Sequence, residues 1–133
     1  GMNFLQAPRL PDGRFSVLGN AVSLPAARGS DSRPVVVGIR PEHIASGPGG
    51  ATFEVTPVLV EGLGSEVYLY FDLPPQNRMT DALPGAAEDA RRGDRAVARL
   101  MNAGPVRIGH SLTLSVDPSR LHVFDPASGV ALQ

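Results

Sequence analysis

The chain has 133 residues, and its 12 basic and 13 acidic residues leave a net charge of −1. The absence of cysteine excludes a disulfide framework and thiolate metal sites. Near-neutral charge and 5% aromatic residues argue against a nucleic-acid binder, because such proteins need basic surfaces and stacking rings. We expect neither a secretory signal nor a membrane span, since no apolar run approaches ~18 residues.

The first half of the chain predicts short strands. A turn at Pro11-Asp12-Gly13 precedes a weak strand at 14–18. Residues 34–39 are a continuous β-branched run, typical of a strand that is covered on both faces. Residues 52–60 alternate between apolar and polar side chains until Pro57, which predicts an edge position or a bulge there.

The second half continues this pattern. Alternation predicts strands at 66–72 and 111–116, and a weaker strand at 121–124. Residues 95–100 suit a helix or a strand, and we interpret them as a strand. The strands recur at roughly the 8–12-residue spacing of sandwiches and barrels, without a strand–helix–strand rhythm. The sequence therefore predicts an all-β antiparallel barrel or sandwich.

Residues 74–93 depart from this regularity. The stretch contains prolines and glycines, and residues 86–92 suit either a short helix or a mobile loop. We therefore expect an insertion-like loop at 74–93, whose role the sequence does not predict.

No segment has the pattern of a catalytic, cofactor or metal site. Residues 62–64 resemble the start of a dinucleotide-binding motif, but its third glycine is missing and a strand pattern follows. The connector at 47–50 lacks the lysine of a phosphate-binding loop, and the chain contains no lysine. The histidines lack metal-ligand spacing, standing apart at His43, His110 and His122. We expect no catalytic residue, metal or cofactor in this chain.

Four segments, in order, resemble the C-terminal region of ATP-binding proteins from sugar- and glycerol-phosphate-type ABC importers. Residues 2–5 resemble the start of that region, and residues 37–44 (VGIRPEHI) resemble its G-V/I-R-P-E-H-L/I motif. Residues 60–66 (VEGLGSE) resemble V-E-x-L-G-x-E, and residues 121–129 (LHVFDPASG) resemble L-H-L-F-D-x-x-T-G. The shared order extends over nearly the whole chain, and the stretch at 74–93 departs from it.

This resemblance implies an OB-like fold of the TOBE type, with residues 1–133 as one C-terminal regulatory domain. ATP and Mg²⁺ would then belong to an upstream ATPase domain outside this chain. The implied partners are a second copy of the subunit, its own ATPase domain and the membrane permease subunits. In some members a regulatory protein or small effector joins them. The implied location is cytoplasmic, at the inner face of the cell membrane.

The motifs also give expectations for single residues. Arg40 precedes a proline and is restricted to extended geometry. Pro41 suits the first position of a short helical turn, whose positive end favours Glu42. We expect Arg40 to form a charge-assisted pair with Glu61 or Glu66, which would fix one strand pair against another.

Two further residues have structural expectations. Gly64 is expected to adopt a positive φ or to allow a close backbone approach. Phe124 is expected in the core, on a final strand at 121–125 that closes the barrel. The candidate motif and regulatory-interface residues are Arg40, Pro41, Glu42, His43, Glu61, Gly64, Glu66, Phe124 and Asp125.

The sequence favours a non-catalytic dimerisation and regulatory domain of an importer's ATP-binding subunit. Apolar residues on both faces of 35–39 and 58–60 motivate the dimer, and burial within the barrel explains them equally well. Three alternatives stay open: a small-effector-sensing OB-like module, an OB-type nucleic-acid binder and an independent hydrolase.

Overall fold

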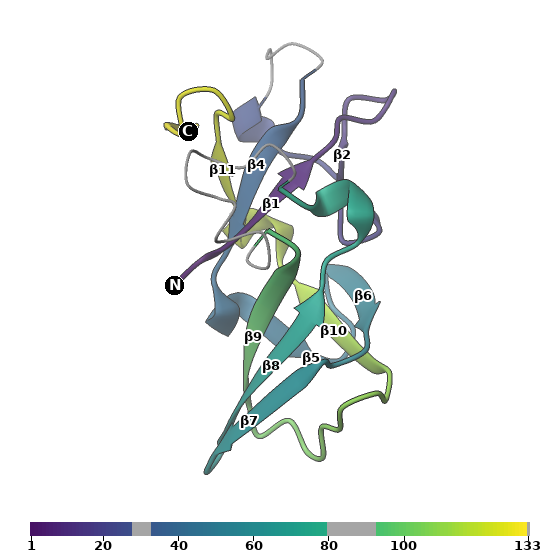
Figure 1. Ribbon diagram of the computed structural model, residues 1–133. Coiled ribbons are helices and arrows are strands. Elements are labelled where there is room, and N and C mark those ends of the chain that lie inside the picture. The colour runs from purple at the N-terminus through teal and green to yellow at the C-terminus, as the bar shows by residue number, and fades with distance from the viewer. Residues whose placement is uncertain (28–32, 80–92, 133) are drawn as a thin grey trace.

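Short antiparallel strands and single 3₁₀ turns form the regular structure of the described residues (Figure 1). The computed structural model describes residues 1–27, 33–79 and 93–132. The all-β prediction is confirmed over these residues. The predicted helix or loop at 86–92 lies outside them, as does most of the stretch at 74–93.

The strands of the described residues, in chain order, are β1 (Asn3–Ala7), β2 (Phe15–Val17), β3 (Asn20–Val22), β4 (Val35–Ile39), β5 (Ile44–Ser46), β6 (Ala51–Val55), β7 (Leu59–Leu63), β8 (Glu66–Asp72), β9 (Arg95–Met101), β10 (Leu112–Val116), β11 (His122–Phe124) and β12 (Ala131–Leu132). The 3₁₀ turns are η1 (Pro25–Ala27), η2 (Pro41–His43), η3 (Pro75–Asn77) and η4 (Pro118–Arg120). Each turn begins at a proline, whose fixed φ suits the first helical position.

The strands form four antiparallel sheets, ordered β1-β4-β11-β12, β5-β10-β6, β2-β3 and β7-β8-β9. In Figure 1 the sheet that contains β1, β4 and β11 lies in the upper part of the molecule. The hairpin of β7 and β8 extends to the opposite, lower end.

Most predicted strands are present, and the ambiguous segment at 95–100 is strand β9. The segment at 52–60 breaks at Pro57 into β6 and β7, which belong to different sheets. At this break the N–H of Val58 donates to Tyr70 O at 2.8 Å, while Leu59 is the register partner of Tyr70. Two residues therefore oppose one, which is the predicted bulge.

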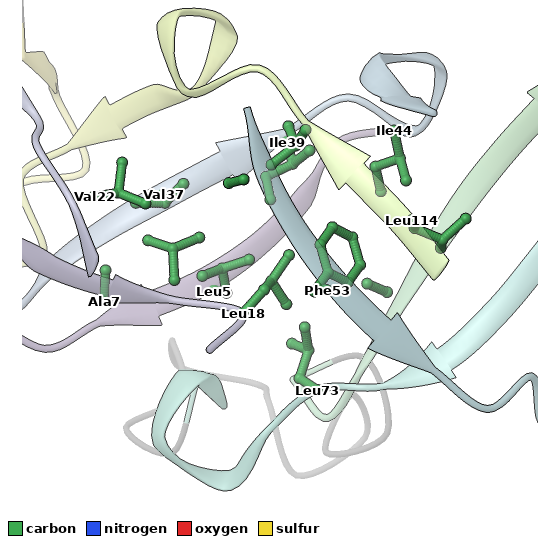
Figure 2. Close-up of a cluster of buried hydrophobic side chains, with 14 of the residues drawn as sticks. Leu5, Ala7, Leu18, Val22, Val37, Ile39, Ile44, Phe53, Leu73 and Leu114 are labelled. Carbon is green, nitrogen blue, oxygen red and sulfur yellow. The ribbon is translucent and has the colours of Figure 1, made fainter. Parts of the chain in front are cut away.

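One hydrophobic core joins the sheets. Leu5, Leu18, Phe53 and Leu73 point into the same interior, although they come from distant segments (Figure 2). The rings of Phe53 in β6 and Phe71 in β8 lie 5.9 Å apart between centroids, which places the β7–β9 sheet against the β5-β10-β6 sheet. Burial of these side chains is the main stabilising contribution.

The buried amide of Asn77 connects η3 to the first strands of the chain. Its Nδ2 donates to Gln6 O at 2.9 Å and to Ser16 O at 2.8 Å, and its Oδ1 accepts from Leu18 N at 3.0 Å. Leu18 has a φ of 50°, which is unfavourable for a residue with a branched side chain. The bond from Asn77 and the burial of the Leu18 side chain hold this tight β2–β3 turn in place.

A second amide, that of Asn3, connects β1 to the edge of β9. Its Nδ2 donates to Val97 O at 2.9 Å, and its Oδ1 accepts from Val97 N at 2.7 Å. The same Nδ2 donates to Ile39 O in β4 at 3.0 Å. Asn3 therefore satisfies both backbone groups of one residue at the β9 edge and fixes the β7–β9 sheet to the rest of the molecule.

We predict that Asn77→Ala lowers the free energy of unfolding by about 3 kcal/mol, because it removes three hydrogen bonds, one to a buried and two to partly buried backbone groups. Urea denaturation measures the change. Gln76→Ala is the matched control, since Gln76 is an exposed neighbour in η3 and should stay within about 0.5 kcal/mol of the native chain. Equal losses in the two variants would contradict the structural role of Asn77.

Candidate interaction face

The β7–β9 sheet is built on a tight hairpin. Leu63 pairs with Glu66, and the connecting residues are Gly64 and Ser65. Gly64 has a φ of +65°, and an added Cβ would meet no atom within 4 Å. The expectation of a positive φ at Gly64 is confirmed, and no close backbone approach is involved. A glycine at the first central position is typical of the type II′ turns that connect hairpin strands.

Alternation along the three strands separates two faces of this sheet. The inner face is buried, and its core residues are Leu69, Phe71, Ala96, Ala98 and Leu100. The opposite face, here called the outer face, has no buried residue. It consists of Leu59, Glu61 and Leu63 in β7, Glu66, Tyr68, Tyr70 and Asp72 in β8, and Arg95, Val97, Arg99 and Met101 in β9.

The outer face exposes three large apolar side chains. Leu59, Leu63 and Met101 are 44%, 61% and 56% exposed, and they flank the half-buried Tyr68 and Tyr70. Aromatic residues, methionine and arginine are enriched where proteins meet other proteins. The composition of the outer face is therefore that of an interaction surface.

The register arranges the outer face in rows that run across the three strands. From β7 through β8 to β9, one row is Leu59, Tyr70 and Val97. The next row is Glu61, Tyr68 and Arg99. The last row, next to the hairpin turn, is Leu63, Glu66 and Met101.

Ionisable groups on the outer face interact within the sheet. Arg99 donates from Nε to Glu66 Oε1 at 3.1 Å and also from its terminal amino group to the same oxygen. Arg95 donates to Asp72 Oδ1 at 3.1 Å. Partial burial, and after it the hydrogen-bonded Glu61 carboxylate, raises the pKa of Tyr70 above its ordinary value, because both disfavour the tyrosinate.

The expected pairing of Arg40 with Glu61 or Glu66 is wrong. Arg40 is exposed and makes no ion pair in the part of the chain that the structure describes. Glu66 is paired with Arg99 instead. The physical reason is register, which places Glu66 and Arg99 on the same face of two adjacent strands. Arg40 lies outside the sheet, before η2.

The other expectations for the R-P-E-H motif are confirmed. Arg40 is extended, with a φ of −70° and a ψ of 136°, and Pro41 is buried at the start of η2. The pKa of Glu42 is lowered, first by its own backbone N–H and further by the charges of His43, Arg40 and Arg99. His43 is half-buried, and its Nδ1 is buried without a hydrogen-bond partner among the described residues. η2 packs beside β9, and the charge of Glu42 interacts with that of Arg99 on the outer face.

The last motif forms a turn, and Phe124 is not in the core. Phe124 is half-buried and packs edge-on against Phe4, with ring centroids 5.7 Å apart, while Val123 occupies the buried position of β11. The ring fits because Gly38 has no Cβ, which would lie 3.0 Å from it. β11 is also not the final strand, since β12 pairs with its other edge. The expectations of a core anchor and a closing strand are corrected accordingly.

Asp125 stabilises the turn that follows β11. Its Oδ1 accepts hydrogen bonds from Ala127 N at 2.7 Å and from Ser128 N at 3.0 Å. These bonds lower the pKa of Asp125 by favouring its carboxylate. The residue therefore has a local structural role in the turn.

One further feature of the described residues is a hollow outside the β7–β9 sheet. A hollow of about 300 Å³ is lined by Pro105, Val106, Arg107, His110, Ser111 and Leu112, none of which belongs to the four motifs. Residues 1–27, 33–79 and 93–132 contain no group of three or more potential metal ligands. Their helical turns are too short to cross a membrane.

Two protein-family models match this chain. The model of the MalK OB fold domain matches residues 1–44, and that of the TOBE domain matches residues 37–100. The chain belongs to the MalK-type OB and TOBE domain families. The two matches meet in the R-P-E-H motif, and the TOBE match contains the whole β7–β9 sheet except Met101.

Curated relatives of this chain are import and transport ATP-binding proteins, as the motifs predicted. The trehalose import ATP-binding protein SugC of Mycobacterium tuberculosis is 33% identical over 98% of the chain and 38% of its own length. The sn-glycerol-3-phosphate import ATP-binding protein UgpC of Paracoccus denitrificans is 37% identical over 89% of the chain and 29% of its own length. The sulfoquinovosyl glycerol transport ATP-binding protein SmoE of Agrobacterium fabrum is 31% identical, with 93% and 31% covered. The chain thus spans roughly a third of the length of these relatives.

Because Arg40 makes no ion pair among the described residues, we predict that Arg40→Ala changes the free energy of unfolding by less than about 0.5 kcal/mol. Thermal and urea denaturation measure this change. A decrease of more than about 1 kcal/mol in the free energy of unfolding would instead support an ion pair between Arg40 and Glu61 or Glu66.

We predict that Glu61→Gln lowers the pKa of Tyr70, because it removes the negative charge that disfavours the tyrosinate. Tyrosinate absorbance is followed against pH in a Tyr68→Phe background, where Tyr70 is the only tyrosine of the chain. Since the folded pKa is the higher one, the associated stability is present below about pH 10 and is lost as pH rises through the folded pKa. Identical titrations with and without Glu61→Gln would contradict the contact.

Proposed function

We propose that this chain is a non-catalytic regulatory domain of the ATP-binding subunit of an ABC importer, and that it joins two such subunits. The outer face of the β7–β9 sheet carries this proposal, because it presents leucines, a methionine and two tyrosines to solvent on a rigid sheet. A surface of this composition is stabilised when a protein partner covers it. The TOBE family and the importer relatives support the regulatory role.

The proposal extends to the complete subunit. Residues 1–133 would act as one regulatory domain, with residues 74–93 as an insertion. ATP and Mg²⁺ would bind an ATPase domain outside this chain, and that domain would contact the permease subunits at the cytoplasmic face of the membrane. The names of the relatives refer to trehalose, glycerol-3-phosphate and sulfoquinovosyl glycerol, which suggests a carbohydrate or polyol derivative as the imported solute.

A second candidate function is the sensing of a small effector. The hollow at 105–112 favours it, because Arg107 and His110 line a space of about 300 Å³. An anionic metabolite would suit these side chains. Calorimetry with sugar phosphates discriminates the two functions, since an effector module would release heat on binding at micromolar to millimolar concentrations.

We predict that the chain associates reversibly in solution, from a mass of 13.9 kDa toward twice that value. Sedimentation equilibrium between about 1 µM and 1 mM measures the association, a range that corresponds to dimers held by about 4–8 kcal/mol. The same samples should hydrolyse no ATP. A strictly monomeric chain at 1 mM would contradict the proposal that this domain joins subunits on its own.

A further inference from the structure

We propose that two copies of the chain meet through their outer faces, about a two-fold axis that runs parallel to β8 and passes beside Tyr68. This inference rests on the proposed joining function and specifies its surface and geometry. It follows from the order of side chains within the three rows of the outer face.

The axis direction is selected by charge. A two-fold rotation about a line parallel to the strands exchanges the two sides of the sheet, so β7 of one copy lies over β9 of the other and β8 lies over β8. In the middle row, Glu61 of each copy then faces Arg99 of the other copy. An axis perpendicular to the strands in the same row would instead place Glu61 over Glu61 and Arg99 over Arg99. Only the parallel axis brings opposite charges together.

The same rotation matches the apolar residues of the outer rows. Leu59 lies over Val97 of the second copy, and Leu63 lies over Met101. Leu59, Leu63 and Met101 are the large apolar side chains that the outer face exposes, so this arrangement covers all three. A surface that matches itself row by row is what a two-fold symmetric dimer requires.

The side chains of the central strand lie over their own copies. Tyr68 and Tyr70 lie over their own copies near the axis, where aromatic rings pack in offset or edge-on pairs. Glu66 and Asp72 also approach their own copies, and their carboxylates are already paired within the chain, with Arg99 and Arg95 respectively. Two packed sheets stand about 10 Å apart with strands inclined by about 30°. A two-fold axis that departs from the direction of β8 by about half that angle, and so stays close to parallel, produces this inclination.

Charge reversal tests this geometry. Glu61→Arg and Arg99→Glu are made separately, and each should weaken self-association at least about tenfold, because each places like charges opposite one another. An equimolar mixture of the two variants should associate within about threefold of the native chain, since positions 61 and 99 of one variant would again face opposite charges on the other. Sedimentation equilibrium gives the dissociation constants. Arg120→Glu is the matched control, because Arg120 is exposed and lies in η4, outside the β7–β9 sheet.

A second pair of variants guards against misfolding, since Arg99→Glu also removes the bond to Glu66. Leu63→Arg and Met101→Glu change exposed side chains that have no role in the core. Each alone should weaken association, and their mixture should restore it. Circular dichroism and the thermal midpoint confirm that every variant is folded.

The outcomes separate the two proposals. A native chain that never associates overturns the joining function together with this interface. A native chain that dimerises, with variants that dimerise equally well, overturns the interface alone and directs attention to the open edge of β7. Variants that dissociate alone and fail to associate when mixed also overturn the geometry, because the altered residues then do not face each other.

Discussion

The β7–β9 sheet is joined to the first strand of the chain by one hydrogen-bonded contact, between the side-chain amide of Asn3 and the backbone of Val97. An open sheet edge invites pairing with other chains, because its N–H and C=O groups lack partners. Asn3 closes the β9 edge at Val97 and also binds Ile39 O in β4. Together with the packing of Phe71 on Phe53, this contact holds the sheet with its apolar face in the core and with its outer face toward solvent.

The sequence motifs divide between this junction and the outer face. The R-P-E-H motif forms η2 beside β9, where Pro41 is buried, so it supports the sheet from outside. The V-E-x-L-G-x-E motif builds the hairpin, and Glu61 and Glu66 project onto the outer face. Tyr68, which lies between Glu61 and Arg99 in the middle row, belongs to neither motif. Motifs alone therefore locate the sheet but only part of its surface.

Sequence predictions succeeded where a feature depends on residues close together in the chain, and they failed where it depends on distant residues. Alternation along seven residues identifies β8, and the lack of an N–H on Pro57 marks the break before β7. Strands β3, β5 and β12 have two or three residues, too few to show a period. They exist because neighbouring strands supply their hydrogen bonds. Phe124 was misassigned because a half-buried ring on the outside of a sheet has the same pattern as a core residue.

The sequence by itself determined the all-β class, the family and the glycine turn at Gly64, because these depend on local periodicity, motif order and backbone sterics. It also indicated which face of β8 is apolar. Only the tertiary structure decided that Arg99, rather than Arg40, pairs with Glu66, and that Glu61, Tyr68 and Arg99 form one row. The physical reason is that register between β8 and β9 is set by contacts between residues 33 positions apart, such as Glu66 and Arg99, which no local pattern encodes.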